Sequence, residues 1–361
     1  MADILDNLYE LSNAHGPSGF EGQIRNIMRR ELDPFCDNLE TDGLGSLIGH
    51  FKGSDVSGPK VMMAAHMDEV GLMVKYITAE GYVKFQTLGG WLDQALINQR
   101  WIIHTKLGPV DGLTGIKTPH VMSADSRNQI FKRDGLFLDV GAASKEDAQE
   151  RLGITPGDPV TPASKVSRMV GSQLLVGKAW DDRVGLAVMI EILNRLNSVN
   201  ISSNLYVVAT VQEEVGLRGA QTSSHQIRPA IGINLESGVA GDYPGTSQDE
   251  SQEKLGKGPA IFLHDSSMIP NLDLRDLFVE IAEEEKIPVQ FDVLSGYGED
   301  GAEMQRSHDG VPSINISVPT RYLHSHNGII SLDDVARTVD LVVSVTKRLD
   351  SKTVNKLKSF T

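Results

Sequence analysis

Residues 61–68 read Val-Met-Met-Ala-Ala-His-Met-Asp: five apolar residues run directly into His66, and Asp68 follows two positions later. A short apolar run of this length is consistent with a buried strand. In open α/β sheets, ligands bind just beyond the carboxyl ends of the strands. The stretch therefore predicts an α/β sheet whose functional edge carries His66.

Three further apolar runs lead into polar side chains in the same way. They are Leu205–Val211 before Glu213 and Glu214, Ile231–Leu235 before Glu236, and Ile314–Val318 before His324. A fifth motif contains Asp181 and Asp182. Because strands of one sheet end at a common edge, we expect these groups to converge. Two imidazoles and several carboxylates, without a thiolate, are typical ligands of a hydrolytic zinc, cobalt or manganese centre.

Each motif alone also has a structural interpretation. A strand often ends in a polar residue where the chain leaves the core, and adjacent acids such as Glu213 and Glu214 are usually solvated. The five motifs together favour a metal site, because paired buried carboxylates are costly unless a cation neutralises them.

The residues around these motifs match a known family. The matching stretches are Ala65–Gly71, Lys178–Arg183, Gln212–Ala220, Gly310–Ser313 and Arg321–Ser325. Together they span most of the chain, and the chain resembles the M42 metallo-aminopeptidases, which include the glutamyl aminopeptidases and the large tetrahedral aminopeptidases. The resemblance implies a metal-dependent aminopeptidase that releases N-terminal residues from short peptides.

The resemblance also implies which residues hold metal. His66, Asp181 and Glu236 would bind one divalent ion, and Asp181, Glu214 and His324 would bind a second, with Asp181 bridging the two. Zinc or cobalt is the expected metal, and manganese is a further candidate. A bridged pair of this kind lies about 3.5–4 Å apart and lowers the pKa of a shared water towards ~7. The family further implies a cis peptide bond after Asp181.

Two acids would assist the metal ions. By the same resemblance, Asp68 would orient the imidazole of His66. Glu213 would be the general base, which takes a proton from the water and passes it to the leaving amine. His326, two residues beyond His324, is an alternative ligand, although the family motif selects His324.

Two regions depart from the family pattern. Glu236 stands where the family usually has aspartate, and its side chain reaches one methylene further. The loop Gly298–Met304 carries two extra acids, Glu299 and Glu303, which would favour a basic N-terminal residue by charge complementarity. The alternative is that both acids face solvent. The candidate substrate-binding residues are Glu299, Asp300 and His120, and for His120 an ordinary loop position is the alternative.

The pattern of apolar runs predicts the fold class α/β: a mixed-sheet catalytic domain with helices on both faces, interrupted by a smaller β-barrel-like insertion domain. Residues 1–71 and 167–361 would form the catalytic domain. Residues 72–166 carry short β-like runs separated by glycine and proline, which are typical of a small barrel or sandwich. Within them only Lys145–Leu152 reads as a helix. Ser18 and Glu21 match a capping box before a helix.

The family's inserted domain serves dimerisation and, in many members, assembly into a hollow tetrahedron of twelve subunits. The resemblance therefore implies a homo-oligomer built from dimers, with a dodecamer as the larger possibility. Residues 119–134 of the insertion are expected to form a polar surface segment.

Composition narrows the function classes. Of 361 residues, 40% are hydrophobic and 23% are charged, which is ordinary for a soluble globular protein. The net charge of −14 argues against binding to nucleic acid or to an anionic membrane. Cys36 is the single cysteine, so an internal disulfide or thiolate cluster is excluded. With no signal peptide or membrane span in the sequence, we expect a cytoplasmic protein.

Other functions remain open at this point. A carboxypeptidase or deacylase would use the same metal pair, and a carboxypeptidase would need a cation such as Arg218 or Arg321 to hold a free carboxylate. A glycoside hydrolase needs two carboxylates flanking a sugar and typically an aromatic-lined cleft, whereas aromatic residues make up only 6% of the chain. A non-catalytic binding protein would lack a ligand or the base, and all are present.

Overall fold

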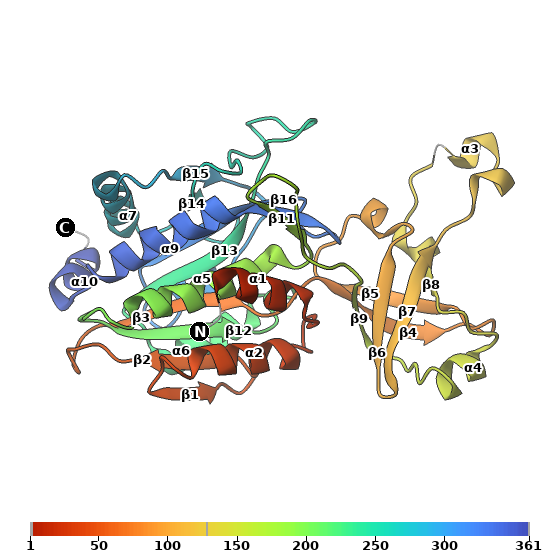
Figure 1. The fold of residues 1–361 in the computed structure, drawn as a ribbon, viewed down its shortest axis with the longest axis horizontal. Helices are drawn as coiled ribbons and strands as arrows, with labels where there is room; N and C mark the ends of the chain where they lie inside the picture. The colour runs from red at the N-terminus through yellow and green to blue at the C-terminus, as the bar shows by residue number, and fades with distance from the viewer. Residues whose placement is uncertain (1–2, 128, 360–361) are drawn as a thin grey trace.

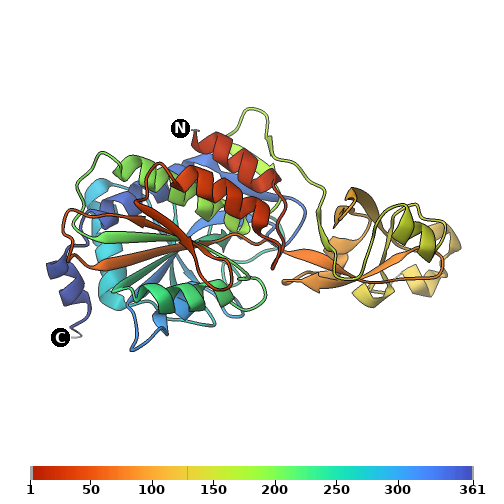
Figure 2. The same cartoon turned by 90° about the horizontal axis from the view of Figure 1, so that it is seen from below.

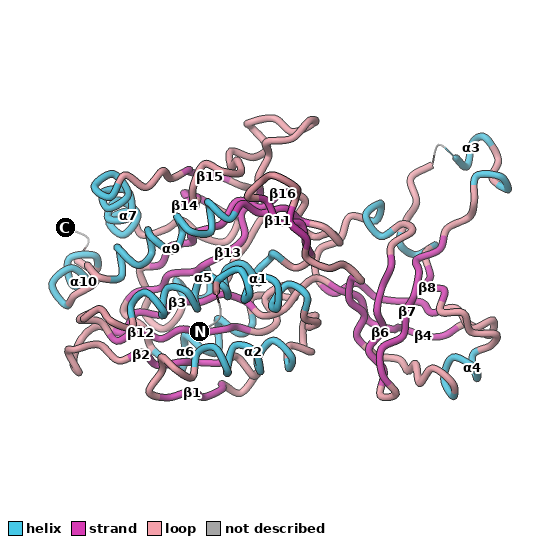
Figure 3. The backbone as a smooth tube through the Cα atoms, viewed as in Figure 1, coloured by secondary structure: helices cyan, strands magenta, loops and turns pink. Residues whose placement is uncertain are grey.

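The computed structural model describes residues 3–127 and 129–359. Within these residues the chain forms a large mixed sheet with helices on both faces, joined to a smaller closed barrel (Figure 1). This arrangement confirms the predicted fold class. Figure 3 shows the strands gathered in these two groups.

The large sheet has a parallel centre with antiparallel edges. β12, β3, β13 and β16 are adjacent and parallel to one another, and the strands outside them, β2 and β17, pair antiparallel. The strands, in spatial order, are β1 (Asn38–Thr41), β2 (Leu47–Phe51), β12 (Asn204–Thr210), β3 (Lys60–His66), β13 (Ile231–Val239), β16 (Ser313–Arg321), β17 (Gly328–Ser331), β11 (Leu174–Gly177) and β10 (Ser167–Arg168). Off this path, β14 (Ala260–His264) pairs with β16 and with β15 (Gln290–Val293).

Helices cover both faces of this sheet, as Figure 2 shows for the two red helices above it and the green helix below. One face carries α1 (Ile4–Asn13), α2 (Gly22–Leu32), α5 (Trp180–Leu196), α7 (Leu272–Glu285) and α9 (Leu332–Thr346), and the other carries α6 (Arg218–Ile227) and α8 (Gly301–Gln305). α10 (Ser351–Leu357) follows α9. The central strands are buried on both sides, which explains why their sequences read as continuous apolar runs.

The barrel is an insertion between β3 and β10. Its strands are β4 (Gly71–Ile77), β5 (Val83–Leu88), β8 (Phe137–Asp139), β7 (Gly108–Gly115), β6 (Arg100–Thr105) and β9 (Pro159–Pro162). It encloses its own hydrophobic cluster, which includes Leu72, Trp101 and Val160 and is separate from the cluster around the sheet. On this basis we propose residues 72–166 as the inserted domain.

The insertion contains more helical structure than its sequence predicted. The expected helix is present as α4 (Lys145–Glu150), but α3 (Ala124–Arg127) and three short 3-10 helices, Asp93–Leu96, Pro119–Val121 and Arg133–Gly135, accompany it. These pieces are too short to show a periodic apolar face, so sequence periodicity could not reveal them. No helix within the described residues is long and apolar enough to cross a bilayer.

Candidate metal centre

The parallel strands bring the predicted ligands to one edge of the sheet. His66 is the last residue of β3 and pairs with Thr210, the last residue of the neighbouring strand β12. Glu213 and Glu214 follow Thr210 closely in sequence and therefore lie at the same edge of the sheet as His66. Glu236 lies within β13 and is in register with Ser317 of the parallel strand β16. His324 follows β16, and Asp181 lies at the start of α5, which packs on β3 and β13. All five predicted ligands therefore meet, although they span most of the sequence.

Asp181 lies between two groups of ligand atoms. Its Oδ1 is 2.8 Å from Nε2 of His66, and its Oδ2 is 3.3 Å from Nε2 of His324. Glu236 Oε1 is 3.4 Å from the His66 nitrogen, and Glu214 Oε1 is 3.5 Å from the His324 nitrogen. The two oxygens of one carboxylate thus face two separate clusters, which is the arrangement of a bridging ligand.

Asp182 also lies close to His66 and Glu236. Both of its carboxylate oxygens, however, accept backbone N–H bonds, from His66 at 3.1 Å and from Gly185 at 3.0 Å. Its role in this geometry is to tie the start of α5 to the end of β3. The peptide bond between Asp181 and Asp182 is cis, as the family resemblance implied.

The electrostatics of the cluster fit divalent cations. Burial, reinforced by neighbouring carboxylates, raises the pKa of Glu213 and Glu236 well above the usual range and that of Glu214 to about 8. Two buried oxygens, Oε1 of Glu214 and Oε2 of Glu236, have no hydrogen-bond partner. Such a concentration of buried acids is unfavourable without positive charge. Carboxylate and imidazole donors in this proportion suit zinc, cobalt or manganese.

Asp68 organises the site in two ways. Its backbone carbonyl lies 3.0 Å from Nδ1 of His66, with its carboxylate Oδ1 at 3.5 Å, so Nε2 of the ring faces the ligand cluster. The carboxylate accepts the backbone N–H of Glu213 at 2.9 Å and of Glu214 at 3.2 Å. Ser18 donates its hydroxyl hydrogen to the same carboxylate at 2.6 Å. Asp68 therefore orients the histidine and also fixes the turn that carries both glutamates.

Ser18 and Glu21 do not form the predicted capping box. α2 begins at Gly22 without a side-chain cap. Ser18 bonds to Asp68 instead, and Glu21 Oε1 accepts N–H bonds from Gly19 and Gln212 at 2.7 and 3.2 Å. Hydrogen bonds to Asp68 and to Gln212, which precedes Glu213 and Glu214, thus take the place of the local helix cap.

The predicted substrate residues lie away from the pocket above the ligands. Glu299 and Asp300 are almost completely buried, so the alternative that Glu299 faces solvent is wrong. Glu299 accepts a bond from Asn234 at 3.4 Å, and Asp300 accepts one from Thr210 at 2.5 Å. His120 is exposed in the segment that leads to α3, and α3 lies at the side of the barrel away from the large sheet (Figure 1). The predicted surface segment 119–134 is mostly exposed, apart from Asn128, which lies outside the described residues.

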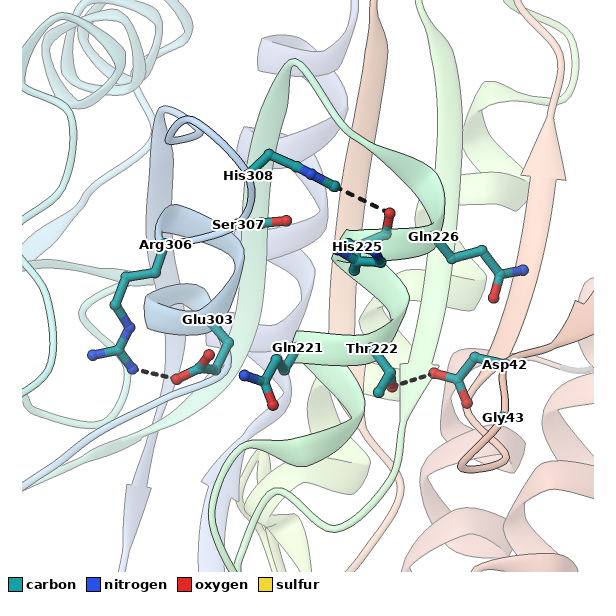
Figure 4. A pocket seen from close by; sticks show the side chains of 10 residues that line it. All are labelled: Asp42, Gly43, Gln221, Thr222, His225, Gln226, Glu303, Arg306, Ser307 and His308. Atoms are coloured by element: carbon teal, nitrogen blue, oxygen red, sulfur yellow. Dashed lines mark hydrogen bonds and ion pairs between the residues drawn. The ribbon is translucent and has the colours of Figure 1, made fainter.

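Glu303 lines a different cavity, which is shown in Figure 4. This cavity of about 500 Å³ lies between α6, α8 and the loop at Asp42. Several of its polar groups pair with one another: Glu303 pairs with Arg306, Thr222 donates to Asp42, and His308 bonds to the carbonyl of His225. The cavity contains none of the predicted catalytic or metal-binding residues.

The pocket above the ligand cluster has a volume of about 300 Å³. Besides predicted residues, its walls include Gly90, Leu217 and Tyr297, which the sequence did not single out. Tyr297 donates its hydroxyl hydrogen to the carbonyl of Ser237 at 2.7 Å and stacks on Phe262. Its position between Gly296 and Gly298, beside the acidic loop, was the signal available in the sequence. Gly90 comes from the barrel and had no such signal.

His326 is not among the converging ligands. Its ring packs against Trp101, with centroids 4.3 Å apart, and its Nε2 lies 3.1 Å from the carbonyl oxygen of Arg100. Cys36 is half-buried and burial raises its pKa to about 12, which argues against a thiolate nucleophile.

Comparisons with known proteins identify the family of this chain. The sequence profile of the M42 glutamyl aminopeptidase family matches residues 45–341. A TET aminopeptidase from a marine sediment archaeon, Thaumarchaeota archaeon SCGC AB-539-E09, is 40% identical, with a TM-score of 0.95 over 98% of this chain and 99% of that one. The lysyl aminopeptidase of Pyrococcus furiosus is 34% identical over 92% of this chain and 94% of its own length. The TET1 peptidase of Pyrococcus horikoshii, which can assemble into a tetrahedron or a large octahedral shell, is 31% identical with a TM-score of 0.86, over 96% of this chain and all of that one.

Proposed function

Because this chain belongs to the M42 peptidase family, we propose that it is a dinuclear metallo-aminopeptidase that releases N-terminal residues from short peptides. The observation that carries the proposal is the position of Asp181, with one carboxylate oxygen towards His66 and the other towards His324. A bridging carboxylate between two ligand groups is typical of two-metal hydrolases.

The ligands divide into two sets. His66, Asp181 and Glu236 would hold one ion, and Asp181, Glu214 and His324 the other, with zinc or cobalt as the proposed metal and manganese as a further candidate. When bound, two such ions would lower the pKa of a water and polarise the scissile carbonyl. Glu236 would reach its cluster from within β13, where its Oε1 lies 3.4 Å from Nε2 of His66.

Glu213 is the proposed general base. It lines the pocket, its Oε2 is 3.9 Å from Nε2 of His66, and its backbone is held by Asp68. Burial raises its pKa well above that of an ordinary glutamate, which suits a group that must both accept and return a proton. Glu213 would take the proton of the attacking water and then deliver it to the leaving amine.

The lining of the pocket favours an aminopeptidase over a carboxypeptidase. Of the described residues, no lysine or arginine lines it, so a free carboxylate has no cationic clamp. Arg321 is paired with Asp242 at 2.6 Å, and Arg218 is bonded to Gln212 at 3.0 Å. Tyr297 is the single aromatic residue among the described lining residues, which gives little support to a sugar-binding cleft.

The proposed function is tested with aminoacyl-p-nitroanilides of Glu, Asp, Leu, Lys, Arg and Ala, together with N-acetylated controls, on protein loaded with zinc, cobalt or manganese. We expect cleavage of free substrates only, and its loss on addition of EDTA. Cleavage of blocked substrates, or no cleavage of any free substrate by the loaded protein, would contradict an aminopeptidase. Cleavage that persists in EDTA after metal removal would contradict the metal site.

The same panel tests the side-chain preference. Glu299 and Asp300 are buried and do not line the pocket, so we propose that they act on the substrate only indirectly. His120 lies outside the pocket of its own chain, and we propose no direct contact from it within one subunit. A strong preference for Lys and Arg over Leu would instead support a direct role for the acidic loop.

We propose that the chain forms a homo-oligomer built from dimers, with the inserted barrel as the dimerisation domain. The support is the likeness of this chain to the TET1 peptidase of Pyrococcus horikoshii, a protein that can assemble into a tetrahedron or a large octahedral shell. A dodecamer is the larger assembly consistent with this proposal.

His324→Ala is expected to bind one metal ion per subunit where the wild-type chain binds two. The substitution removes the single imidazole of the Asp181, Glu214 and His324 set and leaves His66 and Glu236 in place. Elemental analysis after exhaustive dialysis measures the ratio. His308→Ala is the matched control, because His308 has a similar left-handed φ, 54° against 52° for His324, but lies in the other cavity. Two ions retained by His324→Ala would remove this residue from the ligand set.

A further inference from the structure

The inserted barrel touches the metal centre through residues Gly89, Gly90 and Trp91, here called the strap. The strap follows β5 and its two glycines lie against ligands of one set. A Cβ atom on Gly89 would lie 2.7 Å from Oε2 of Glu214, and one on Gly90 would lie 3.1 Å from Nδ1 of His324. Main chain from the barrel therefore occupies the space directly behind two proposed ligands.

The strap is anchored within the barrel on both sides of the glycines. Arg133 donates to the side-chain oxygen of Thr87 and to the carbonyl of Trp91, each at 2.8 Å. Trp91 is buried and donates its indole hydrogen to the carbonyl of Gly71 at 3.2 Å. One guanidinium and one indole thus hold the two ends of a segment whose middle has no side chains of its own.

The loop that carries His324 is anchored to the same part of the barrel. His326 is buried between Trp91 and Trp101, with ring centroids 5.8 and 4.3 Å away. Its Nε2 lies 3.1 Å from the carbonyl oxygen of Arg100. His324 is therefore held on one side by Gly90 and, two residues later, by a histidine that is packed into the barrel's aromatic cluster.

We infer that the strap positions Glu214 and His324, so that the barrel completes one of the two metal positions. The inference deepens the proposed function and rests on it. Gly89 lies against Oε2 of Glu214 and leaves Oε1 directed at Nε2 of His324, and Gly90 lies against Nδ1 of the His324 ring, whose Nε2 points towards Asp181. The atoms nearest the two glycines include none from His66 or Glu236, so the effect is specific to one position. Residues that orient metal ligands in this way commonly change metal affinity 10- to 100-fold when altered.

The test compares Gly89→Ala with a control that has the same backbone strain. Gly89 has a φ of 77°, and an added methyl would meet both Glu214 Oε2 and Val70 Cγ1, each at 2.7 Å; Gly141, also in the barrel, has a φ of 65° and nothing within 4 Å of an added Cβ. Zinc binding is measured on the full chain by calorimetric titration and elemental analysis. We expect Gly89→Ala to bind the first ion as wild type does and the second about 10- to 100-fold more weakly, while Gly141→Ala binds both normally.

Gly90→Ala provides a second variant that does not need a left-handed backbone, in case Gly89→Ala fails to fold. Its methyl would press on His324 at 3.1 Å, and we expect the same selective weakening of one ion. Normal binding of both ions by either folded variant would overturn the role of the strap. Equal weakening in Gly141→Ala would overturn it too, because general damage to the barrel would then explain the loss.

The wild-type titration separates this inference from the proposed function. A wild-type chain that binds two ions and cleaves free aminoacyl substrates supports the proposed function whatever the glycine variants do. A wild-type chain that binds fewer than two ions would overturn the dinuclear site and the strap's role together.

Discussion

Glu213→Gln is expected to keep both metal ions and to lose turnover by about 10²- to 10⁴-fold, the usual contribution of a positioned general base. The amide has nearly the same shape as the carboxylate but accepts no proton from the attacking water. The backbone N–H of residue 213 still bonds to Asp68, so the turn that carries Glu214 should be unchanged. The measurement is kcat of the zinc-loaded variant on the best p-nitroanilide, with metal content determined on the same sample.

Glu303→Gln is the matched control for this experiment. It makes the same chemical change in the separate cavity where Glu303 pairs with Arg306 (Figure 4), and its turnover should equal that of the wild type. Near-normal turnover by a fully loaded Glu213→Gln would show that another group removes the proton. Loss of metal from that variant would instead make Glu213 a ligand.

Asp181→Ala is expected to lose both metal ions and, with them, all measurable peptidase activity. Each of its oxygens faces a different histidine, so one substitution removes a donor from both ligand sets. The folded apoprotein should persist, because removing one carboxylate relieves repulsion among the buried acids Glu214 and Glu236. Elemental analysis and circular dichroism of the same preparation measure metal content and folding together.

The comparison with Asp182→Asn decides which of the two adjacent aspartates is the ligand. Asp182 uses both oxygens for the backbone N–H groups of His66 and Gly185, so its amide variant should lose stability but still bind two ions. The opposite result, with metal lost from Asp182→Asn and kept by Asp181→Ala, would exchange their roles. The three variants are therefore expected to bind different numbers of metal ions per subunit: none for Asp181→Ala, one for His324→Ala and two for Asp182→Asn.

The strap changes how the inserted barrel is understood. A domain that only mediated assembly would leave the metal centre intact when perturbed. Here its main chain lies behind Glu214 and His324, and its aromatic cluster holds His326. The second metal position is therefore expected to depend on how the barrel and the sheet are joined.

Much of the fold was predictable because local patterns and the global structure agree. The four apolar runs around His66, Glu213, Glu236 and His324 are buried strands, and parallel strands that end at one edge bring their following residues together. The barrel followed from short strands separated by glycine and proline. The short helices of the insertion were missed because a single turn has no recognisable period.

Local sequence failed where distant partners competed for the same side chain. Ser18 and Glu21 have the spacing of a capping box, yet Asp68 and Gln212 take their hydrogen bonds. Glu299 and Glu303 are close in sequence but differ in their surroundings: Glu299 is buried, whereas Glu303 lines the cavity of Figure 4. The side chains of Asp181 and Asp182 are likewise distinguished by their partners alone.

By itself, the sequence determined the fold class and placed most of the predicted ligands in or just after buried strands, because the order of apolar and polar residues reflects burial and backbone periodicity. Only the tertiary structure decided which oxygen of Asp181 faces which histidine, where the acidic loop turns, and that Gly89 and Gly90 reach the site from another domain. The contacts of Asp181 with the histidines and of Gly89 and Gly90 with the ligands join residues more than a hundred positions apart. Glycine has no side chain whose chemistry could indicate such a contact in the sequence. The role of Gly89 and Gly90 is therefore visible only in the structure, in the space that these residues leave for Glu214 and His324.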